Sequence, residues 1–335
     1  MKRLIPILVL FAVVVVIILV KRGGASSDAE PIVWYGMMPH PYITEVRIGA
    51  EAAERDLGID ILKVVGQEWT QDNANANVRA LSTKDHRAFS IFPGDPAGAN
   101  GLFGQLVRNG QFVVAYGAEP DIPTPASFTV ATDIHQAATD ACEALVSMMG
   151  GKGRILNVLE TVTDVNTKVR NDAIVAVADK YPDVRIVQTI SDMTQVSVAK
   201  ERIQSALAAL GDGVDGIITT GYNPTIAAAA VLTEWHANPN HKRIRYIGID
   251  TGSTVMEAIR NGSIDATVAQ NPFGHGYISC MLLARMVDGA VPREPYQFIN
   301  AGHVIITKDN IDTYTDDIRA ITDRIVADID TTYLK

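Results

Sequence analysis

Two polar side chains, Asp250 and Gln270, each stand at the end of an apolar run, where they could hydrogen-bond a small polar ligand. Asp250 follows the run 244–249, and Gln270 closes the run 264–269, with a helical pattern over 251–260 between them. Ligands of open parallel α/β sheets bind beyond the carboxyl ends of the strands, so we expect both side chains to face one crevice. A carboxylate and an amide can each meet two neighbouring hydroxyl groups, as a sugar offers them. The alternative is that Asp250 only caps the helix and Gln270 is a solvated strand end.

The rest of the chain alternates strand and helix patterns, which is typical of doubly wound parallel sheets and predicts an α/β fold. With 335 residues the chain is long for one core, so we expect two lobes joined by a multi-strand hinge. The first lobe is assigned to residues 31–131 and 271–301, and the second lobe to 132–270 and 302–335. The amphipathic tail 311–329 is expected to pack on the second lobe.

The N-terminal residues 1–30 are predicted to lie outside this fold. Residues 4–20 form an apolar run, broken only by Pro6, between the basic pairs Lys2-Arg3 and Lys21-Arg22. A run of this length nearly spans a hydrocarbon core of roughly 30 Å, so it is either an anchor formed by a hydrophobic helix or a signal peptide cleaved near 24–27. Either alternative places the body in the periplasm or on the outer face of the cytoplasmic membrane.

The composition argues against several classes of protein. A formal net charge of -9 is the opposite of what nucleic-acid binding requires. Cys142 and Cys280 both lie in apolar helical patterns and are expected as buried thiols rather than a disulfide. The sequence has no CxxC, HExxH, Walker-type loop, GxSxG or GxGxxG motif, so we expect no enzyme activity, no cofactor and no metal.

The stretch around Asp250 and Gln270 reads IGID, a helix and NGSIDATVAQ, and it resembles the ribose-type periplasmic sugar-binding proteins. Their pattern is V-G-x-D, a helix and D/N-G-x-I-x-A-T-x-x-Q, in which the Asp and the Gln hydrogen-bond the sugar. The resemblance covers residues 32–307 and implies the type I periplasmic binding protein fold, with the ligand captured by closure of the lobes. It further implies a monomer that delivers its ligand to an ABC transporter permease in the membrane.

Other motifs of this family assign candidate ligand-binding residues by position. HPYITEVRIGAEAAERDLG is similar to a helix opened by N-P-F-F and implicates His40 and Tyr42. A tyrosine there could stack on a sugar ring and still offer its hydroxyl group. TDVNTKVRNDAI is similar to N-x-x-x-R-x-x-G-F and implicates Asn166 and Arg170.

Two further matches concern helix starts. TTGYNPTIAAAAV resembles the family's strand-end Asn-Asp, and either Tyr222 or Asn223 can take the place that faces the ligand. Asn223 followed by Pro224 also has the pattern of a helix cap. TVATDIHQAATDACEAL resembles the first crossing between the lobes, where Asp133 is expected mainly as the cap of the next helix and secondarily as a site residue.

Two departures from the family pattern argue against ribose itself. Where the family carries Asp-Arg after the fourth strand, this chain has Gly117 and Ala118, with Glu119 as the nearest charge. The stacking phenylalanine of the second lobe is replaced by Met193. Replacement rings at the cleft wall are expected from Trp69 and from Trp34 or Tyr35. A different sugar, a polyol or a sugar derivative is therefore the expected ligand.

Three alternative functions belong to other classes. A regulator of the lactose-repressor type shares the two lobes, but it needs an N-terminal helix-turn-helix where this chain has an apolar run. An exported sensor that passes ligand occupancy to a membrane receptor agrees with every motif above. An enzyme could use Asp250, His275 and Ser279 as a catalytic set, although no nucleophile elbow accompanies them.

Overall fold

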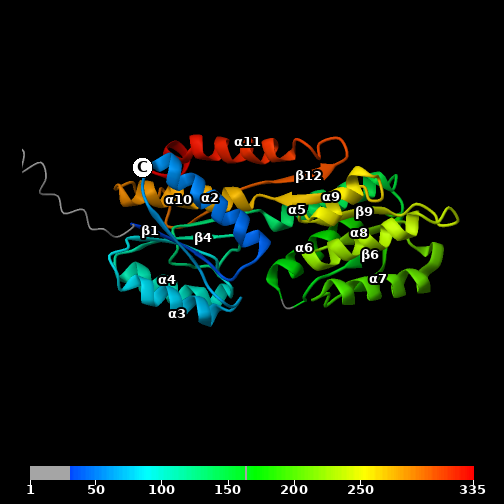
Figure 1. The fold of residues 1–335 in the computed structure, drawn as a ribbon, viewed down its shortest axis with the longest axis horizontal. Coiled ribbons are helices and arrows are strands. Elements are labelled where there is room, and N and C mark those ends of the chain that lie inside the picture. Colours follow the sequence, from blue (N-terminus) through cyan, green and yellow to red (C-terminus); the bar gives the residue numbers. More distant parts are fainter. Residues whose placement is uncertain (1–30, 163) are drawn as a thin grey trace, which may run out of the picture.

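The computed structural model describes residues 31–162 and 164–335, which form two lobes side by side (Figure 1). The run 4–20, predicted as a signal peptide or a hydrophobic anchor helix, lies outside the described residues. Within the part of the chain that is described, no helix is both long and apolar enough to cross a membrane.

Each lobe is built, within the described residues, on one six-stranded sheet, which confirms the prediction of an α/β fold with two parallel-sheet lobes. The first sheet has the order β11-β5-β4-β3-β1-β2 with parallel pairs, and the second has the order β12-β10-β9-β8-β6-β7, in which β12 runs antiparallel to β10. The strands of the first sheet are β1 (Ile32–Gly36), β2 (Ile61–Val65), β3 (Ala88–Ile91), β4 (Phe112–Tyr116), β5 (Phe128–Ala131) and β11 (Gln297–Asn300). Those of the second are β6 (Gly153–Val158), β7 (Val184–Ile190), β8 (Gly216–Thr219), β9 (Arg245–Ile249), β10 (Ala266–Gln270) and β12 (His303–Thr307).

Helices cover both faces of each sheet, which explains why the central strands are continuous apolar runs. In the first lobe the helices are α2 (Pro41–Leu57) and α10 (Pro272–Val287) on one face, and α3 (Gln71–Ser82) and α4 (Pro96–Arg108) on the other (Figure 1). In the second lobe α5 (Ile134–Met148) and α6 (Val165–Ala178) pack on one face, and α7 (Val196–Leu210), α8 (Tyr222–His236) and α9 (Ser253–Arg260) on the other. The last helix, α11 (Tyr314–Ala327), lies against α10 along the top of Figure 1.

The helices α2 and α10 cross at very short range, and two glycines permit this. A Cβ atom on Gly276 would collide with the backbone carbonyl of Val46, and one on Gly49 would collide with that of Phe273. The close crossing brings the first turn of α2 next to the first turn of α10. Both first turns contribute to the site described below.

The chain passes from one lobe to the other after β5, after β10 and between β11 and β12. After α11 it returns to the first lobe, because Ile329 and Leu334 are buried in the core of the first sheet. The assignment of the whole segment 302–335 to the second lobe is therefore wrong at its end. An amphipathic pattern shows that one face of a helix is buried, but it does not specify which neighbour buries that face.

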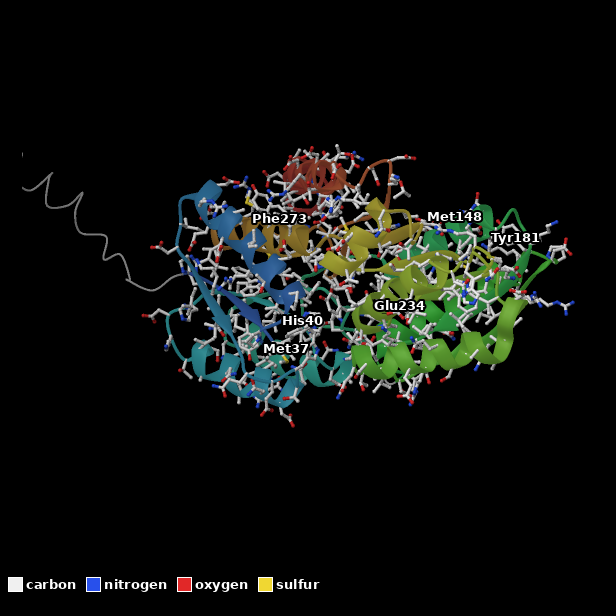
Figure 2. All side chains as sticks on the ribbon, turned by 45° about the vertical axis from the view of Figure 1, so that its right-hand side comes forward. Met37, His40, Met148, Tyr181, Glu234 and Phe273 are labelled. Carbon is white, nitrogen blue, oxygen red and sulfur yellow. The ribbon has the colours of Figure 1, made fainter. Side chains whose placement is uncertain are left out.

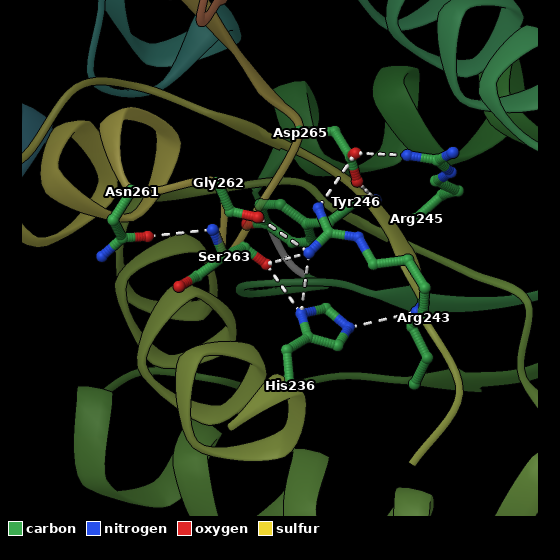
Figure 3. Close-up of polar contacts among 9 residues, drawn as sticks. His236, Arg243, Arg245, Tyr246, Asn261, Gly262, Ser263 and Asp265 are labelled. Carbon is green, nitrogen blue, oxygen red and sulfur yellow. Dashed lines mark hydrogen bonds and ion pairs between the residues drawn. The ribbon is translucent and has the colours of Figure 1, made fainter. Parts of the chain in front are cut away.

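A network of charged groups closes the second lobe at the amino ends of its strands, opposite the ends that carry Asp250 and Gln270 (Figure 3). Asp265 accepts hydrogen bonds from Arg243, over 3.1 Å, and from the backbone N–H of Tyr246, over 2.9 Å. His236 is half-buried beside them, and its Nδ1 lies 2.8 Å from the carbonyl oxygen of Ser263. This network is a stabilising contact remote from the cleft.

Candidate functional site

A cavity of about 530 Å³ lies where the two lobes meet. Its lining includes His40 and Tyr42 from the first turn of α2, Tyr222 from the start of α8, and the strand-end residues Asp250 and Gln270. Figure 2 shows His40 between the lobes. Five of the predicted site residues therefore come together from segments far apart in the sequence.

A polar contact in the lining of this cavity joins Gln270 to Asp250. The side-chain amide of Gln270 donates a hydrogen bond to Oδ1 of Asp250 over 2.8 Å. Asp250, at the end of β9, has a φ of +68°. This left-handed backbone conformation is uncommon for residues other than glycine. The N-cap position of α9 is Gly252, so the alternative in which Asp250 caps that helix is wrong.

His40 caps α2 and contacts aromatic rings from both lobes. Its Nδ1 accepts a hydrogen bond from the backbone N–H of Tyr42 over 3.2 Å. Its ring centroid lies 5.7 Å from that of Trp69 in the first lobe and 6.2 Å from that of Tyr222 in the second. Burial lowers the pKa of His40, and the charge of Asp250 opposes this shift. A neutral imidazole at this place can donate one hydrogen bond toward a ligand.

Aromatic side chains form one wall beside His40. The ring of Phe92 lies edge-on to Trp69, with centroids 5.1 Å apart, and to Tyr42, with centroids 6.2 Å apart. Trp69 is 38% exposed, so it can cover a ligand. Phe92 was missed in the sequence, although it directly follows the buried strand β3, as Asp250 follows β9.

The expectation that Trp34 or Tyr35 supplies a ring at the cleft wall is wrong. Trp34 and Tyr35 are fully buried in the core of the first lobe, where Trp34 stacks on Tyr116 with centroids 5.9 Å apart. The hydroxyl of Tyr42 is hydrogen-bonded to Nδ1 of His275 over 2.9 Å. Tyr42 is also part of the cavity lining.

The second lobe places an arginine and a carboxylate near Asp250. Arg170 is only 9% exposed, and its guanidinium donates to the carbonyl oxygen of Thr220 over 3.2 Å. Burial lowers the pKa of Arg170, while the carboxylates of Asp250, Asp164 and Glu160 oppose the shift. Arg170 is thus a buried cation among carboxylates.

Glu160 was not predicted from the sequence, although it lies two positions after the end of the strand β6. Its Oε1 accepts hydrogen bonds from the backbone N–H of Asn223, over 3.2 Å, and from its side-chain amide, over 2.8 Å. Burial raises the pKa of Glu160. These bonds engage Asn223 with Glu160, so of the two alternatives it is Tyr222 that lines the cavity. The N-cap of α8 is Gly221, and the expected cap at Asn223 is wrong.

Six predicted site residues are not part of the cavity lining: Trp69, Arg170 and Asn223, described above, and Glu119, Asp133 and Asn166. Glu119 is exposed and accepts a hydrogen bond from the Tyr296 hydroxyl over 2.6 Å. Asp133 caps α5 by accepting from the backbone N–H of Gln136 over 2.9 Å, as predicted. Asn166 is half-buried in the first turn of α6.

The catalytic set considered for an enzyme does not form. His275 and Ser279 are both fully buried, and the Ser279 hydroxyl lies 2.8 Å from that of Ser90 while His275 faces Tyr42 and Thr132. Among the described residues there is also no cluster of three or more His, Cys, Asp or Glu side chains that could hold a metal ion. Cys142 and Cys280 are free and buried, as predicted.

Comparison with known proteins agrees with this architecture. The periplasmic binding protein domain matches residues 34–290 of the chain. The D-apiose import binding protein of Actinobacillus succinogenes is 24% identical over 235 residues, which are 69% of this chain and 73% of that protein. The xylitol-binding protein of Mycolicibacterium smegmatis is 20% identical over 277 residues, which are 81% of this chain and 75% of that protein.

A solved structure gives the same fold. The solute-binding protein of an ABC transporter from Burkholderia graminis, in complex with D-arabinose, superposes with a TM-score of 0.75 at 20% identity. The superposition covers 84% of this chain and 96% of that one. Since the domain match spans most of the described residues and the two-lobed fold agrees with it, the chain belongs to the periplasmic binding protein family, as a non-catalytic binding protein of the ribose-binding type.

Proposed function

We propose that this protein captures a sugar, or a sugar-like polyol or derivative, in the cavity between its lobes. The observation that carries the proposal is the pairing of Gln270 with Asp250 in that cavity. The pair presents a carboxylate and an amide side by side, which suits neighbouring hydroxyl groups. The relatives named above for D-apiose and xylitol, and the D-arabinose complex, all concern uncharged polyhydroxy compounds, which supports this class of ligand.

Both lobes contribute to binding in this proposal. His40 and Tyr42, with Trp69 beside them, contact the ligand from the first lobe, and Tyr222 and Arg170 do so from the second lobe. A ligand that contacts both lobes binds the closed form more tightly than the open form and so shifts the equilibrium toward closure. Asp250 and Gln270 lie next to the hinge and hold the ligand in both forms.

The captured ligand is then delivered, as a further part of the proposal, to an ABC transporter permease in the membrane. The family is extracytoplasmic, which supports export of the body or its anchoring through residues 4–20. We further propose that the protein acts as a monomer, because one chain supplies both walls of the cavity.

Thermal unfolding of the purified protein, freed of bound ligand, tests the proposal against pentoses, hexoses, polyols and amino acids. A ligand at 100 times its dissociation constant stabilises the folded state by about 2.7 kcal/mol, which gives a clear upward shift of the unfolding temperature. We expect a shift with one sugar or polyol that is clearly smaller in Asp250→Asn at the same ligand concentration. A shift with amino acids alone, or with none of the compounds, would contradict the proposal.

A further inference from the structure

A buried chain of hydrogen bonds runs from the cavity into the hinge. Tyr42 lines the cavity, and its hydroxyl lies 2.9 Å from Nδ1 of His275. The other ring nitrogen of His275, Nε2, lies 3.3 Å from the hydroxyl of Thr132. The Thr132 hydroxyl lies 3.0 Å from the carbonyl oxygen of Gly302. His275 is fully buried, and Thr132 is 1% exposed.

The direction of each hydrogen bond follows from the groups involved. A carbonyl oxygen can only accept, so the Thr132 hydroxyl donates its single hydrogen to Gly302. Thr132 must then accept from Nε2–H of His275, and Nδ1 of His275 must accept from the Tyr42 hydroxyl. Burial lowers the pKa of His275 to about 3, so the ring is neutral and carries one proton, as this arrangement requires. His275 is therefore fixed in its Nε2–H tautomer.

The chain of bonds connects the segments that join the lobes. Thr132 directly follows β5, His275 lies in the first turn of α10 after β10, and Gly302 lies between β11 and β12. Asn271 reinforces the same place, because its side-chain amide donates to the carbonyl oxygen of Ala301 over 2.7 Å. A change at the cavity wall can thus reach every one of these segments through hydrogen bonds.

The space for the Tyr42 hydroxyl is provided by Gly117. A Cβ atom on Gly117 would collide with that hydroxyl, and the residue has a φ of +77°, which favours glycine. The ribose-type pattern carries an aspartate at the position of Gly117. The contact with the Tyr42 hydroxyl explains why this chain has a glycine there. Gly117 thus leaves room for the Tyr42 hydroxyl beside its hydrogen-bond partner His275.

We infer that His275 is a positioning residue for ligand binding, which orients the Tyr42 ring at the cavity wall and connects it to the hinge. This inference rests on the proposed function, since it concerns the same cavity. Two substitutions of His275 each keep one of its two hydrogen bonds and remove the other. In His275→Asn the side-chain carbonyl can take the place of Nδ1 and still accept from Tyr42, whereas in His275→Gln the amide nitrogen can take the place of Nε2 and still donate to Thr132.

A double-mutant cycle with Tyr42→Phe tests the inference, with the sugar that stabilises the wild-type protein as the probe. A hydrogen bond contributes about 0.5–1.5 kcal/mol, so we expect Tyr42→Phe and His275→Gln each to raise the dissociation constant roughly threefold to tenfold. The double variant should be no weaker than either single variant. In His275→Asn the dissociation constant should stay within about twofold of wild type.

His236→Gln is the matched control, because His236 is a half-buried histidine at the remote end of the second lobe (Figure 3). It should leave the dissociation constant unchanged. An affinity of His275→Gln equal to wild type, or additive losses in the double variant, would overturn the inference while leaving sugar binding by the wild type intact. Failure of the wild type to bind any sugar would instead contradict the proposed function.

A measurement without ligand checks the same geometry. Nitrogen-15 NMR of the imidazole should show His275 with a protonated Nε2 and an unprotonated Nδ1 that accepts a hydrogen bond. Tyr42→Phe should shift the Nδ1 resonance and leave His236 unchanged. A proton on Nδ1 in the wild-type protein would overturn the assignment of His275.

Discussion

The side-chain amide of Gln270 holds Oδ1 of Asp250 at 2.8 Å, across the ends of the adjacent strands β10 and β9. The contact fixes one carboxylate oxygen and leaves Oδ2 for other donors. It also links two strands that end at the cavity, so the pair is oriented before any ligand arrives. Preorganised polar groups lose less conformational entropy on binding.

Asp250→Asn is expected to weaken sugar binding about tenfold to hundredfold, because hydrogen bonds to charged groups contribute about 1.5–3 kcal/mol. Asparagine tolerates the left-handed conformation at this position, so the unfolding temperature of the ligand-free protein should change little. Asp250→Ala should weaken binding to the same extent. It should also lower the free energy of unfolding by about 1 kcal/mol, because alanine tolerates the left-handed conformation less well. Isothermal titration calorimetry and urea unfolding measure the two effects.

The matched control is Asp309→Ala, which removes an exposed carboxylate just after β12, at the opposite end of the second sheet. Its affinity for the sugar should equal that of wild type. If Asp250→Asn bound as tightly as Asp309→Ala, the strand-end pair would not be part of the site.

Arg170→Met is expected to weaken binding at least roughly tenfold, since it removes the buried cation of the second lobe while keeping an unbranched side chain. Arg170→Lys should recover little, because an ammonium group lacks the planar fork of a guanidinium. Lys168→Met is the control on the same helix, where Lys168 is exposed and pairs with Asp172 over 2.6 Å. Equal losses in the two methionine variants would point to a general charge effect and not to a site at Arg170.

The strand-end argument predicted Asp250 and Gln270 correctly as neighbours, because the end of an apolar run is a local property of the sequence. The same argument applies to Phe92, which directly follows β3, and to Glu160, which lies two positions after the end of β6. Their positions at the cleft were therefore accessible from the sequence.

Contacts between distant segments were not accessible in this way. Tyr42 and His275 are 233 positions apart, and no local pattern indicates that the hydroxyl of one meets the ring of the other. Trp34 lies within an apolar strand, and its complete burial depends on helices on both faces of the sheet. The return of Ile329 and Leu334 to the first lobe is likewise a packing outcome.

Gly276→Ala should destabilise the protein, because the new methyl group would collide with the backbone of α2 at the crossing of α2 and α10. Overpacking of this kind costs about 1–3 kcal/mol in urea unfolding. Gly101→Ala should instead stabilise the protein. Gly101 is exposed in α4 with nothing within 4 Å of the new Cβ, and alanine stabilises a helix by about 1 kcal/mol relative to glycine. A neutral Gly276→Ala would show that the two helices can move apart freely.

The stability of the protein should depend on pH through Glu160, whose pKa is raised by burial above its ordinary value of 4.5. A carboxyl group with a raised pKa in the folded state binds its proton more tightly there than in the unfolded chain. Ionisation of Glu160 therefore costs stability as the pH rises from about its ordinary pKa through its folded pKa, and the loss persists above it. Below that window both states are protonated and the loss disappears.

Glu160→Gln tests this dependence, because glutamine keeps an oxygen that accepts from Asn223 but carries no charge. In urea unfolding we expect the variant to be more stable than wild type at pH 7.5 and equal to it near pH 4. Glu257→Gln removes the same charge from the exposed face of α9 and is the matched control. A variant less stable than wild type at pH 7.5 would mean that the attraction between Glu160 and Arg170 outweighs the cost of burying the carboxylate. Glu160 would then be required in its charged form to hold Arg170 at the cleft.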